Sequence, residues 1–338
     1  MVPRRRLALI GALVALPLLA FAVTRIAMDG TDTAVTTSGT STTTPADEDP
    51  TTSTSEAPSS TTTTTTSSTT TTTATASTLA GKTATTPLPR VPRPGEPVAA
   101  SDARGLADQI RIAETAIVDP STPPIEVQNQ AHLQQVAYRA LVNQPDRKAA
   151  VFALLDPPLR AIAEANVTAG GKLRSMIKTP KTSLPPWRIV APAPADELLG
   201  YYKEAEAATG VPWHYLASIN LVETRMGRIR GDSDAGAQGP MQFLPSTWTQ
   251  YGNGGDINSN RDAIMAAARL LKRNGAPGDM RNAIFNYNHD TRYVDAVLAY
   301  GDRMASDERA LLGYHGWQVY YVTTNGDVWL AEGYDAQS

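Results

Sequence analysis

One carboxylate in this sequence, that of Glu223, occupies a position where a protein could use it for acid–base chemistry. Leu216 and Ile219 precede it at helical spacing, so a helix over this stretch would place all three side chains on one inward-facing stripe. Removing a carboxylate from water disfavours its ionised form. We therefore expect burial to raise the pKa of Glu223 from about 4.3 to about 6, which would keep a general acid protonated near neutral pH.

A glycine-rich loop follows this acid closely. Gly227 is the predicted stop of the helix, and the loop itself runs from Gly231 to Gln242. Its glycines would allow the backbone to approach a ligand. Met241 offers an adaptable apolar contact, and Gln242 offers an amide that can both donate and accept hydrogen bonds. The loop is therefore a candidate ligand-binding segment.

A phenol and two amides are grouped further along, in the run Phe285-Asn-Tyr-Asn288. With the acid and the loop they make up the chemical set of a sugar-binding groove: one acid, several amides, hydroxyls and exposed aromatic rings. Asp232 and Asp234 are the nearest candidates for a second carboxylate. We interpret both as turn residues that hydrogen-bond the loop backbone, which leaves Glu223 as the single acid of the predicted site.

Three segments of the chain resemble, in the same order, the motifs of the lytic transglycosylases of bacterial cell walls. They are Glu223-Thr224, Ser233-x-Ala-Gly-Ala-x-Gly-x-Met-Gln242 and Tyr287-Asn288. The resemblance covers about residues 195–305, roughly a third of the chain. It implies a lysozyme-like, mainly helical fold and an enzyme that cuts the glycan strands of peptidoglycan.

The resemblance also implies a role for each motif residue. Glu223 would protonate the glycosidic oxygen between MurNAc and GlcNAc as general acid. It would then act as base on the C6 hydroxyl of MurNAc, giving a 1,6-anhydro product without the second carboxylate that most glycosidases use. Tyr287 would lie near the acid. The side chains that would bind the glycan are those of Ser233, Met241, Gln242, Tyr287 and Asn288.

Two other functions stay open beside the lytic transglycosylase. One is a hydrolytic muramidase on the same fold, in which water is the attacking group. The other is a wall-binding or scaffold protein that keeps the fold without the activity, against which the intact Glu223 motif argues. The chain departs from the family pattern at two positions: Pro240 replaces a large apolar residue, and Thr224 replaces the commoner Ser.

Neither a metal ion nor a cofactor is predicted. The chain has no cysteine, which excludes disulfides, zinc–thiolate sites and thiol nucleophiles. Its 4 histidines lack metal-ligand spacing. The run Asp256-x-Asn258-x-Asn260 resembles the start of a calcium loop. However, Arg261 occupies the glycine position and Ala267 the position of the bidentate glutamate, so we exclude an EF-hand.

The first residues of the chain are typical of an export signal. Arg4-Arg5-Arg6 precede an apolar run from Leu7 to Val23, and we assign residues 1–28 to a signal peptide or signal anchor. Retention as a membrane anchor is the preferred interpretation, because the run is nearly long enough to span a bilayer. Cleavage at the site Ala20-Phe-Ala22 is the alternative. Either way the protein is expected to be extracytoplasmic, anchored in the membrane or secreted to the cell wall.

Residues 29–97 are predicted to form a disordered linker. Most of this stretch is Thr and Ser, whose small apolar surface cannot offset the entropy lost on ordering. The run from Pro87 to Pro94 is stiffer and typical of polyproline II. Such a spacer would let a membrane-held domain reach peptidoglycan, the partner that the resemblance implies. The net charge of -3 disfavours nucleic acid as a partner.

The remaining chain predicts a mainly α protein with a short β-hairpin at its end. Helical periodicity broken by prolines indicates a small helical region over residues 98–180, interpreted as a packing or positioning module. A proline-rich connection leads to the catalytic domain, residues 195–308. Residues 311–338 are assigned to the hairpin, with Asn325-Gly326 as its turn and Thr323 opposite Val328.

Overall fold

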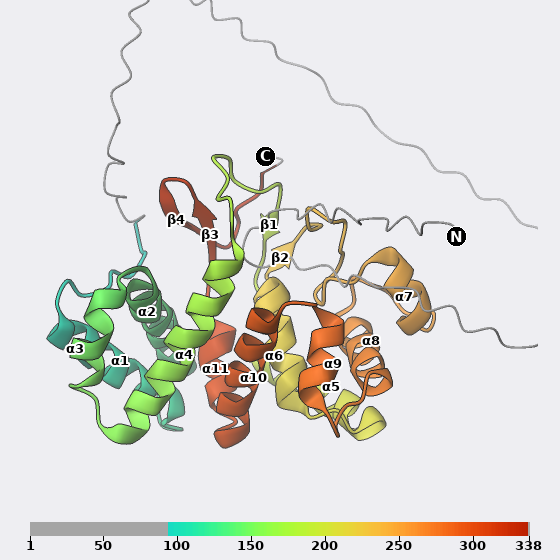
Figure 1. Ribbon diagram of the computed structural model, residues 1–338, viewed down its shortest axis with the longest axis horizontal. Helices are drawn as coiled ribbons and strands as arrows, with labels where there is room; N and C mark the ends of the chain where they lie inside the picture. Colours follow the sequence, from blue (N-terminus) through green and yellow to red (C-terminus); the bar gives the residue numbers. More distant parts are fainter. Residues whose placement is uncertain (1–93, 337–338) are drawn as a thin grey trace, which may run out of the picture. The chain divides into compact units, whose positions relative to one another are not determined.

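The computed structural model describes residues 94–336, so the predicted export segment and nearly all of the predicted linker lie outside the described residues. Eleven α-helices and two antiparallel strand pairs make up the described chain (Figure 1), which confirms the mainly α prediction and the hairpin near the C-terminus. Within this part of the chain, no helix combines the length and the apolar character that crossing a membrane requires.

Prolines and aspartates mark where the first helices begin. Pro124 and Pro157 each occupy the first helical position, where their missing N–H leaves no hydrogen bond unmade. The carboxylates of Asp102 and Asp156 accept hydrogen bonds from backbone N–H groups of the first turns. The predicted breaks are thus confirmed. These elements are α1 (Ala103–Val118), α2 (Pro124–Asn143), the 3₁₀ turn η1 (Pro145–Arg147), α3 (Lys148–Phe152) and α4 (Pro157–Met176).

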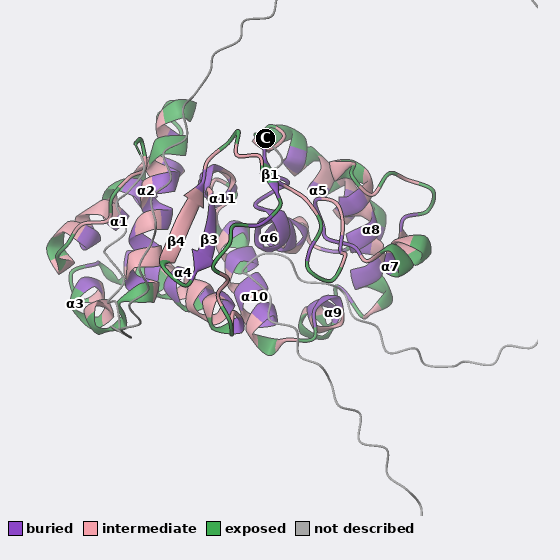
Figure 2. Cartoon of the chain, turned by 90° about the horizontal axis from the view of Figure 1, so that it is seen from above, coloured by how far each residue is buried: buried purple, intermediate pink, exposed green. Residues whose placement is uncertain are grey.

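The second helical block surrounds one buried helix, α6. Figure 2 shows α6 in the buried colour among less buried neighbours, and it packs on α5, α8 and α10. One apolar core cluster includes side chains from this block, from the N-terminal helices and from the hairpin. The helices of the block are α5 (Ala195–Thr209), α6 (Trp213–Thr224), α7 (Pro245–Tyr251), α8 (Asn260–Arg273), α9 (Met280–Tyr287), α10 (Thr291–Ser306) and α11 (Ala310–Gly316).

Helix α6 differs from its prediction in two respects. Every residue from Leu216 to Thr224 is buried, so the helix is enclosed on all sides rather than along one stripe. The helix also ends at Thr224, before the predicted stop at Gly227. Arg225 and Met226 already adopt left-handed conformations, with φ of 54° and 57°. The backbone N–H of Met226 closes the end on the carbonyl of Asn220 (3.1 Å).

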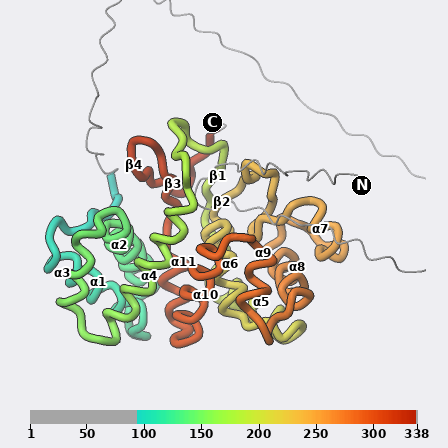
Figure 3. Tube along the Cα trace, in the orientation of Figure 1, coloured from blue at the N-terminus to red at the C-terminus, as the bar shows by residue number. Residues whose placement is uncertain are grey.

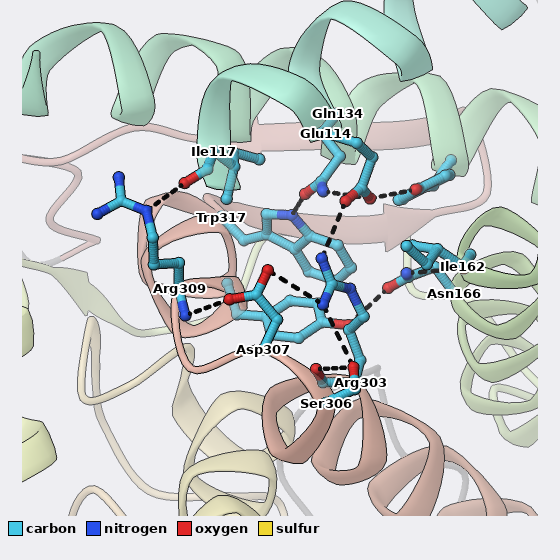
Figure 4. A network of polar contacts seen from close by, with 12 residues as sticks. Glu114, Ile117, Gln134, Ile162, Asn166, Arg303, Ser306, Asp307, Arg309 and Trp317 are labelled. Carbon is cyan, nitrogen blue, oxygen red and sulfur yellow. Dashed lines mark hydrogen bonds and ion pairs between the residues drawn. The ribbon is translucent and has the colours of Figure 1, made fainter. Parts of the chain in front are cut away.

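A buried polar network joins the first two helices to the last two (Figure 4). The carboxylate of Glu114 on α1 accepts hydrogen bonds from Tyr138 Oη (2.5 Å) and Gln134 Nε2 (2.7 Å) on α2. Arg303 on α10 lies 3.5 Å from the same carboxylate, and Trp317 Nε1 donates to Gln134 Oε1 (2.8 Å). Because removing one partner leaves another polar group buried and unpaired, this network ties the N-terminal helices firmly to the rest.

The C-terminal hairpin forms as predicted, but the predicted register of its two strands is wrong. Strand β3 (Val319–Thr323) pairs with β4 (Gly326–Leu330), so that Thr323 lies opposite Gly326 and not opposite Val328. The Thr323 side chain explains the shift: its Oγ1 donates to Gly326 O (2.8 Å) and accepts from Asn325 N (3.1 Å). The turn is therefore one position earlier. Residues 311–316, assigned to the hairpin region, belong to α11.

The proline-rich connection, residues 180–194, runs alongside the hairpin and the last described residues (Figure 3). Lys181 O accepts a hydrogen bond from Thr324 N (3.1 Å), and Ile189 N donates to Tyr334 O (2.8 Å). Strand β1 (Arg188–Ile189) also pairs with β2 (Ile229–Arg230), which follows α6. This segment therefore connects the C-terminal end of the chain to the loop that carries the second motif.

A pH-dependent contact between α2 and the hairpin gives a testable prediction. His132 Nε2 lies 2.9 Å from Tyr320 Oη, and burial lowers the pKa of His132 to about 4, helped by Arg228 and opposed by Glu96. Between about pH 6.5 and 4, His132 therefore binds a proton in the unfolded chain but stays neutral in the folded chain. The contribution of neutral His132 to the free energy of unfolding is fully present above about pH 6.5 and is lost as the pH falls toward 4.

Denaturant unfolding at pH 7, 5.5 and 4.5 measures this loss. The His132→Phe variant removes the titrating group, so its free energy of unfolding should fall less over the interval than that of the parent chain. Equal falls in the two proteins would contradict the role of His132.

Candidate active site

The carboxylate of Glu223 lies where α6 packs on α10. Its Oε1 accepts a hydrogen bond from Tyr293 Oη at 2.6 Å, and neither side chain is exposed to solvent. One and a half turns earlier on α6, Ser218 Oγ donates to the carbonyl of Val297 on α10 (2.6 Å). These two contacts fix how the two helices sit against each other, and thereby fix the position of the acid.

The phenols near Glu223 stay protonated. Burial, followed by the negative charge of Glu223, raises the pKa of Tyr293 well above its usual value. The same two causes raise the pKa of Tyr287, which therefore lies within the electrostatic reach of the acid, as the resemblance implies. Because both phenols keep their protons, Tyr293 is the donor in its bond to Glu223.

Helix α6 also holds the second motif in place. Asn220 Nδ2 and Thr224 Oγ1 both donate to the carbonyl of Pro240, at 2.8 Å and 2.6 Å. Asn220 is itself oriented by Tyr202 on α5, whose hydroxyl donates to Asn220 Oδ1 (2.7 Å). The residues one turn before and directly after the acid thus bind the loop backbone, so the loop is attached to the helix that carries the acid.

The third motif reaches the same loop from α9. Tyr287 Oη donates to the carbonyl of Met241 at 2.6 Å. Asn288 caps α9, with its backbone N–H bonded to Ile284 O (3.0 Å). The three motif segments, the last of which lies far from the first two in sequence, are therefore joined by hydrogen bonds to two consecutive carbonyl groups, those of Pro240 and Met241.

The turn that carries these carbonyls has an unusual backbone. Gln238 and Phe243 exchange two backbone hydrogen bonds of 2.9 Å, and between them Gly239 and Gln242 adopt left-handed conformations with φ of 71° and 49°. A left-handed glutamine is uncommon and indicates local strain. The Gln242 amide donates to Gly239 O (3.0 Å), whereas its buried Oε1 has no hydrogen-bond partner among residues 94–336.

The predicted glycan-binding side chains are more enclosed than expected. Tyr287 is 1% exposed, so the expectation of an exposed aromatic ring is wrong for this residue. Met241 is 0% exposed and belongs to the apolar core. Ser233 accepts hydrogen bonds from the backbone N–H groups of Ala235 (3.2 Å) and Ala237 (2.9 Å), so its hydroxyl shapes the loop.

An open cavity of about 530 Å³ lies against the start of this loop. One wall is the loop segment from Gly231 to Asp234, and the other comes from the proline-rich connection and from Tyr321 of β3. Lys181 spans the two walls through an ion pair with Asp234 (2.6 Å). The polar loop residues therefore share this cavity with the proline-rich connection, for which the sequence predicted only a connecting role.

Tyr293 is the site residue that sequence reasoning missed. It lies outside the three motifs, and only its place on the apolar face of α10 marks it. A buried tyrosine hydroxyl requires a hydrogen-bond partner, so this position could have been singled out as one that needs a polar neighbour.

Within residues 94–336, no three His, Asp or Glu side chains are grouped as a metal ion would require.

The backbone of the turn gives a prediction with a matched control. A Cβ at Gly239 would lie 1.9 Å from the carbonyl oxygen of Ile257, whereas a Cβ at Gly236 would meet nothing within 4 Å. Both glycines have similar φ, 71° and 77°. Gly236→Ala should therefore lower the free energy of unfolding by about 1–2 kcal/mol, the usual cost of a left-handed residue.

Gly239→Ala adds a steric clash to that cost and should lower the free energy of unfolding by about 2–5 kcal/mol. Urea unfolding of both variants beside the parent chain measures the difference. Equal losses in the two variants would show that the turn does not pack against Ile257 as described.

Known proteins offer no further guide to this site. Comparison of the chain with models of protein families, with curated proteins and with solved structures finds no match.

Proposed function

We propose that the protein is a peptidoglycan lytic transglycosylase in which Glu223 is the single general acid and base. The observation that supports this proposal is the meeting of the three motif segments around one buried carboxylate. A buried carboxylate that receives a hydrogen bond from a neutral phenol is well placed for proton transfer, because its orientation is fixed and water is excluded.

The proposed reaction uses one carboxyl group twice, first as an acid and then as a base. Protonated Glu223 gives its proton to the oxygen between C1 of MurNAc and C4 of GlcNAc, and the C1–O bond breaks with its electron pair going to that oxygen. The C6 hydroxyl oxygen of the same MurNAc then bonds to C1, and the carboxylate of Glu223 takes the hydroxyl proton. The acid is regenerated, and the products are a 1,6-anhydro-MurNAc end and a free GlcNAc 4-hydroxyl.

Tyr293 acts in this scheme as a positioning residue. Its hydroxyl donates to Glu223 Oε1 at 2.6 Å, and α10 holds its ring fully buried. The hydrogen bond restricts rotation of the carboxyl group and stabilises the ionised form that exists after the first proton transfer. Tyr293 therefore helps to set the pH at which the acid loses its proton.

Glycan access requires the side chains around the acid to open, because the Glu223 side chain is 0% exposed. Gln242 is one group that a sugar could engage, since its buried Oε1 has no hydrogen-bond partner among the described residues. A sugar hydroxyl that donates to this oxygen would complete the missing bond. The export segment and spacer expected from the sequence would hold this site outside the membrane, within reach of the wall.

The closed site favours one alternative, a wall-binding or scaffold protein without activity. In that case Glu223 and Tyr293 would serve only to hold α6 against α10, and the loop hydrogen bonds would be structural. A hydrolytic muramidase differs only in using water in place of the C6 hydroxyl. The three functions predict different products from the same substrate.

Digestion of purified peptidoglycan by the full chain in detergent, followed by mass spectrometry of the muropeptides, separates them. Products lighter by one water than the hydrolysis products are expected. Hydrolysis products would indicate a muramidase, and binding without cleavage would indicate the inactive alternative. Glu223→Gln keeps the size of the side chain but cannot donate the proton, so it should lower the rate at least about 100-fold.

The Tyr293→Phe variant tests the positioning role. Loss of the phenol donor disfavours the ionised form of Glu223, so activity should persist to higher pH before the acid is lost, while kcat falls. Tyr202→Phe is the matched control, because that buried hydroxyl binds Asn220 and not the carboxylate. Profiles of kcat/KM from pH 5 to 9 give the result. An unshifted alkaline limb in Tyr293→Phe would contradict the role.

A further inference from the structure

A second enclosed site lies away from Glu223, between α2, α4, α10 and the hairpin. It is a small cavity of about 40 Å³, in which charged and polar side chains lie among a mostly apolar lining. Three arginines contribute to this lining, Arg139 from α2, Arg174 from α4 and Arg225 from the end of α6. Asp327 of β4 is the single carboxylate among the residues that line it. The cavity wall therefore carries more positive than negative charge.

Arg225 is the unusual member of this group. Its side chain is buried, and its left-handed backbone at the end of α6 directs it into the cavity. One guanidinium nitrogen, Nη1, donates to Leu221 O (2.8 Å). The central carbon of the guanidinium, Cζ, lies 5.8 Å from the centre of the Trp317 ring. Its Nε is buried without a hydrogen-bond partner, and no carboxylate within residues 94–336 forms an ion pair with it.

The other two arginines both form ion pairs with one carboxylate, that of Asp327. Arg139 Nη2 lies 2.6 Å from Asp327 Oδ2, and Arg174 Nη1 lies 2.7 Å from Asp327 Oδ1. Both carboxylate oxygens of Asp327 are thus paired with an arginine, and Asn143 Nδ2 donates a third hydrogen bond to this carboxylate (3.1 Å). Among the described residues that line the cavity, no further carboxylate remains to balance Arg225, and burial together with the nearby Arg139 lowers its pKa to about 10.

Protein interiors rarely keep an unbalanced cation, because removing a charge from water is unfavourable unless an opposite charge or enough hydrogen bonds replace the water. An arginine fork matches the geometry of carboxylate and phosphate oxygens. The cavity has a mouth, since Asn143 is exposed and the Arg174 side chain is 31% exposed. A small anion could therefore reach the buried guanidinium from solvent.

We propose that this cavity binds a small oxyanion, a carboxylate or phosphate group, which pairs with Arg225 and is held at the mouth by Arg139 and Arg174. The site is separate from the proposed reaction. Glu223 bonds to Tyr293, whereas Arg225 faces Trp317 and the hairpin side of α10. The proposal holds whether or not the protein cleaves peptidoglycan.

Titration calorimetry of the full chain with sodium phosphate and, separately, with sodium acetate tests the proposal at pH 7 and constant ionic strength. We expect saturable binding of at least one of the two at one site per chain, and a rise in the thermal unfolding midpoint with its concentration. Binding of phosphate alone assigns the site to phosphate groups, and binding of acetate assigns it to carboxylates. Binding of neither anion would overturn the proposal.

Two variants locate the binding. Arg225→Met keeps the apolar stem and removes the charge, so it should weaken the observed binding at least tenfold. Arg174→Gln, at the half-exposed mouth, should weaken it as well and provides the test if Arg225→Met does not fold. Arg273→Met, on the exposed face of α8, is the matched control and should bind as the parent chain does. Unchanged binding in both cavity variants would overturn the proposal.

Discussion

The hydrogen bond between Tyr293 and Glu223 is the interaction on which the rest of the site depends. A carboxylate with no exposed surface is tolerated only when its neighbours replace the water it has lost. The same demand applies along α6, whose residues from Leu216 to Thr224 are all buried and include four polar side chains. Neighbouring elements supply a hydrogen-bond partner to each of these groups: α10 to Ser218 and Glu223, α5 and the loop to Asn220, and the loop to Thr224.

Helix α10 links this site to the N-terminal helices. Its first turn carries Tyr293 beside Glu223, and its last turns carry Tyr300 at the arginine-lined cavity and Arg303 beside the buried Glu114. A displacement of the N-terminal helices would thus act on the helix that holds the acid. This arrangement suits the positioning role that the sequence suggested for residues 98–180, a region in which no residue called for catalysis.

Local signals in the sequence were enough to predict the proline breaks between the N-terminal helices, the hairpin and the inward direction of Glu223. Tertiary contacts decided what the prediction missed. The hairpin register depends on how the Thr323 side chain closes its turn, and Tyr293 becomes a site residue only because α10 lies against α6. The course of residues 180–194 likewise depends on pairing with distant strands, which local composition does not encode.

The central claim, that Glu223 directs the C6 hydroxyl and not water to C1, is tested most directly by isotope labelling. Peptidoglycan is digested by the full chain in water enriched in oxygen-18, the products are reduced at once with borohydride, and their masses are measured. The proposed reaction consumes no water, so the MurNAc ends should carry no oxygen-18 and should resist reduction. Reducible MurNAc ends that contain one oxygen-18 atom would contradict it.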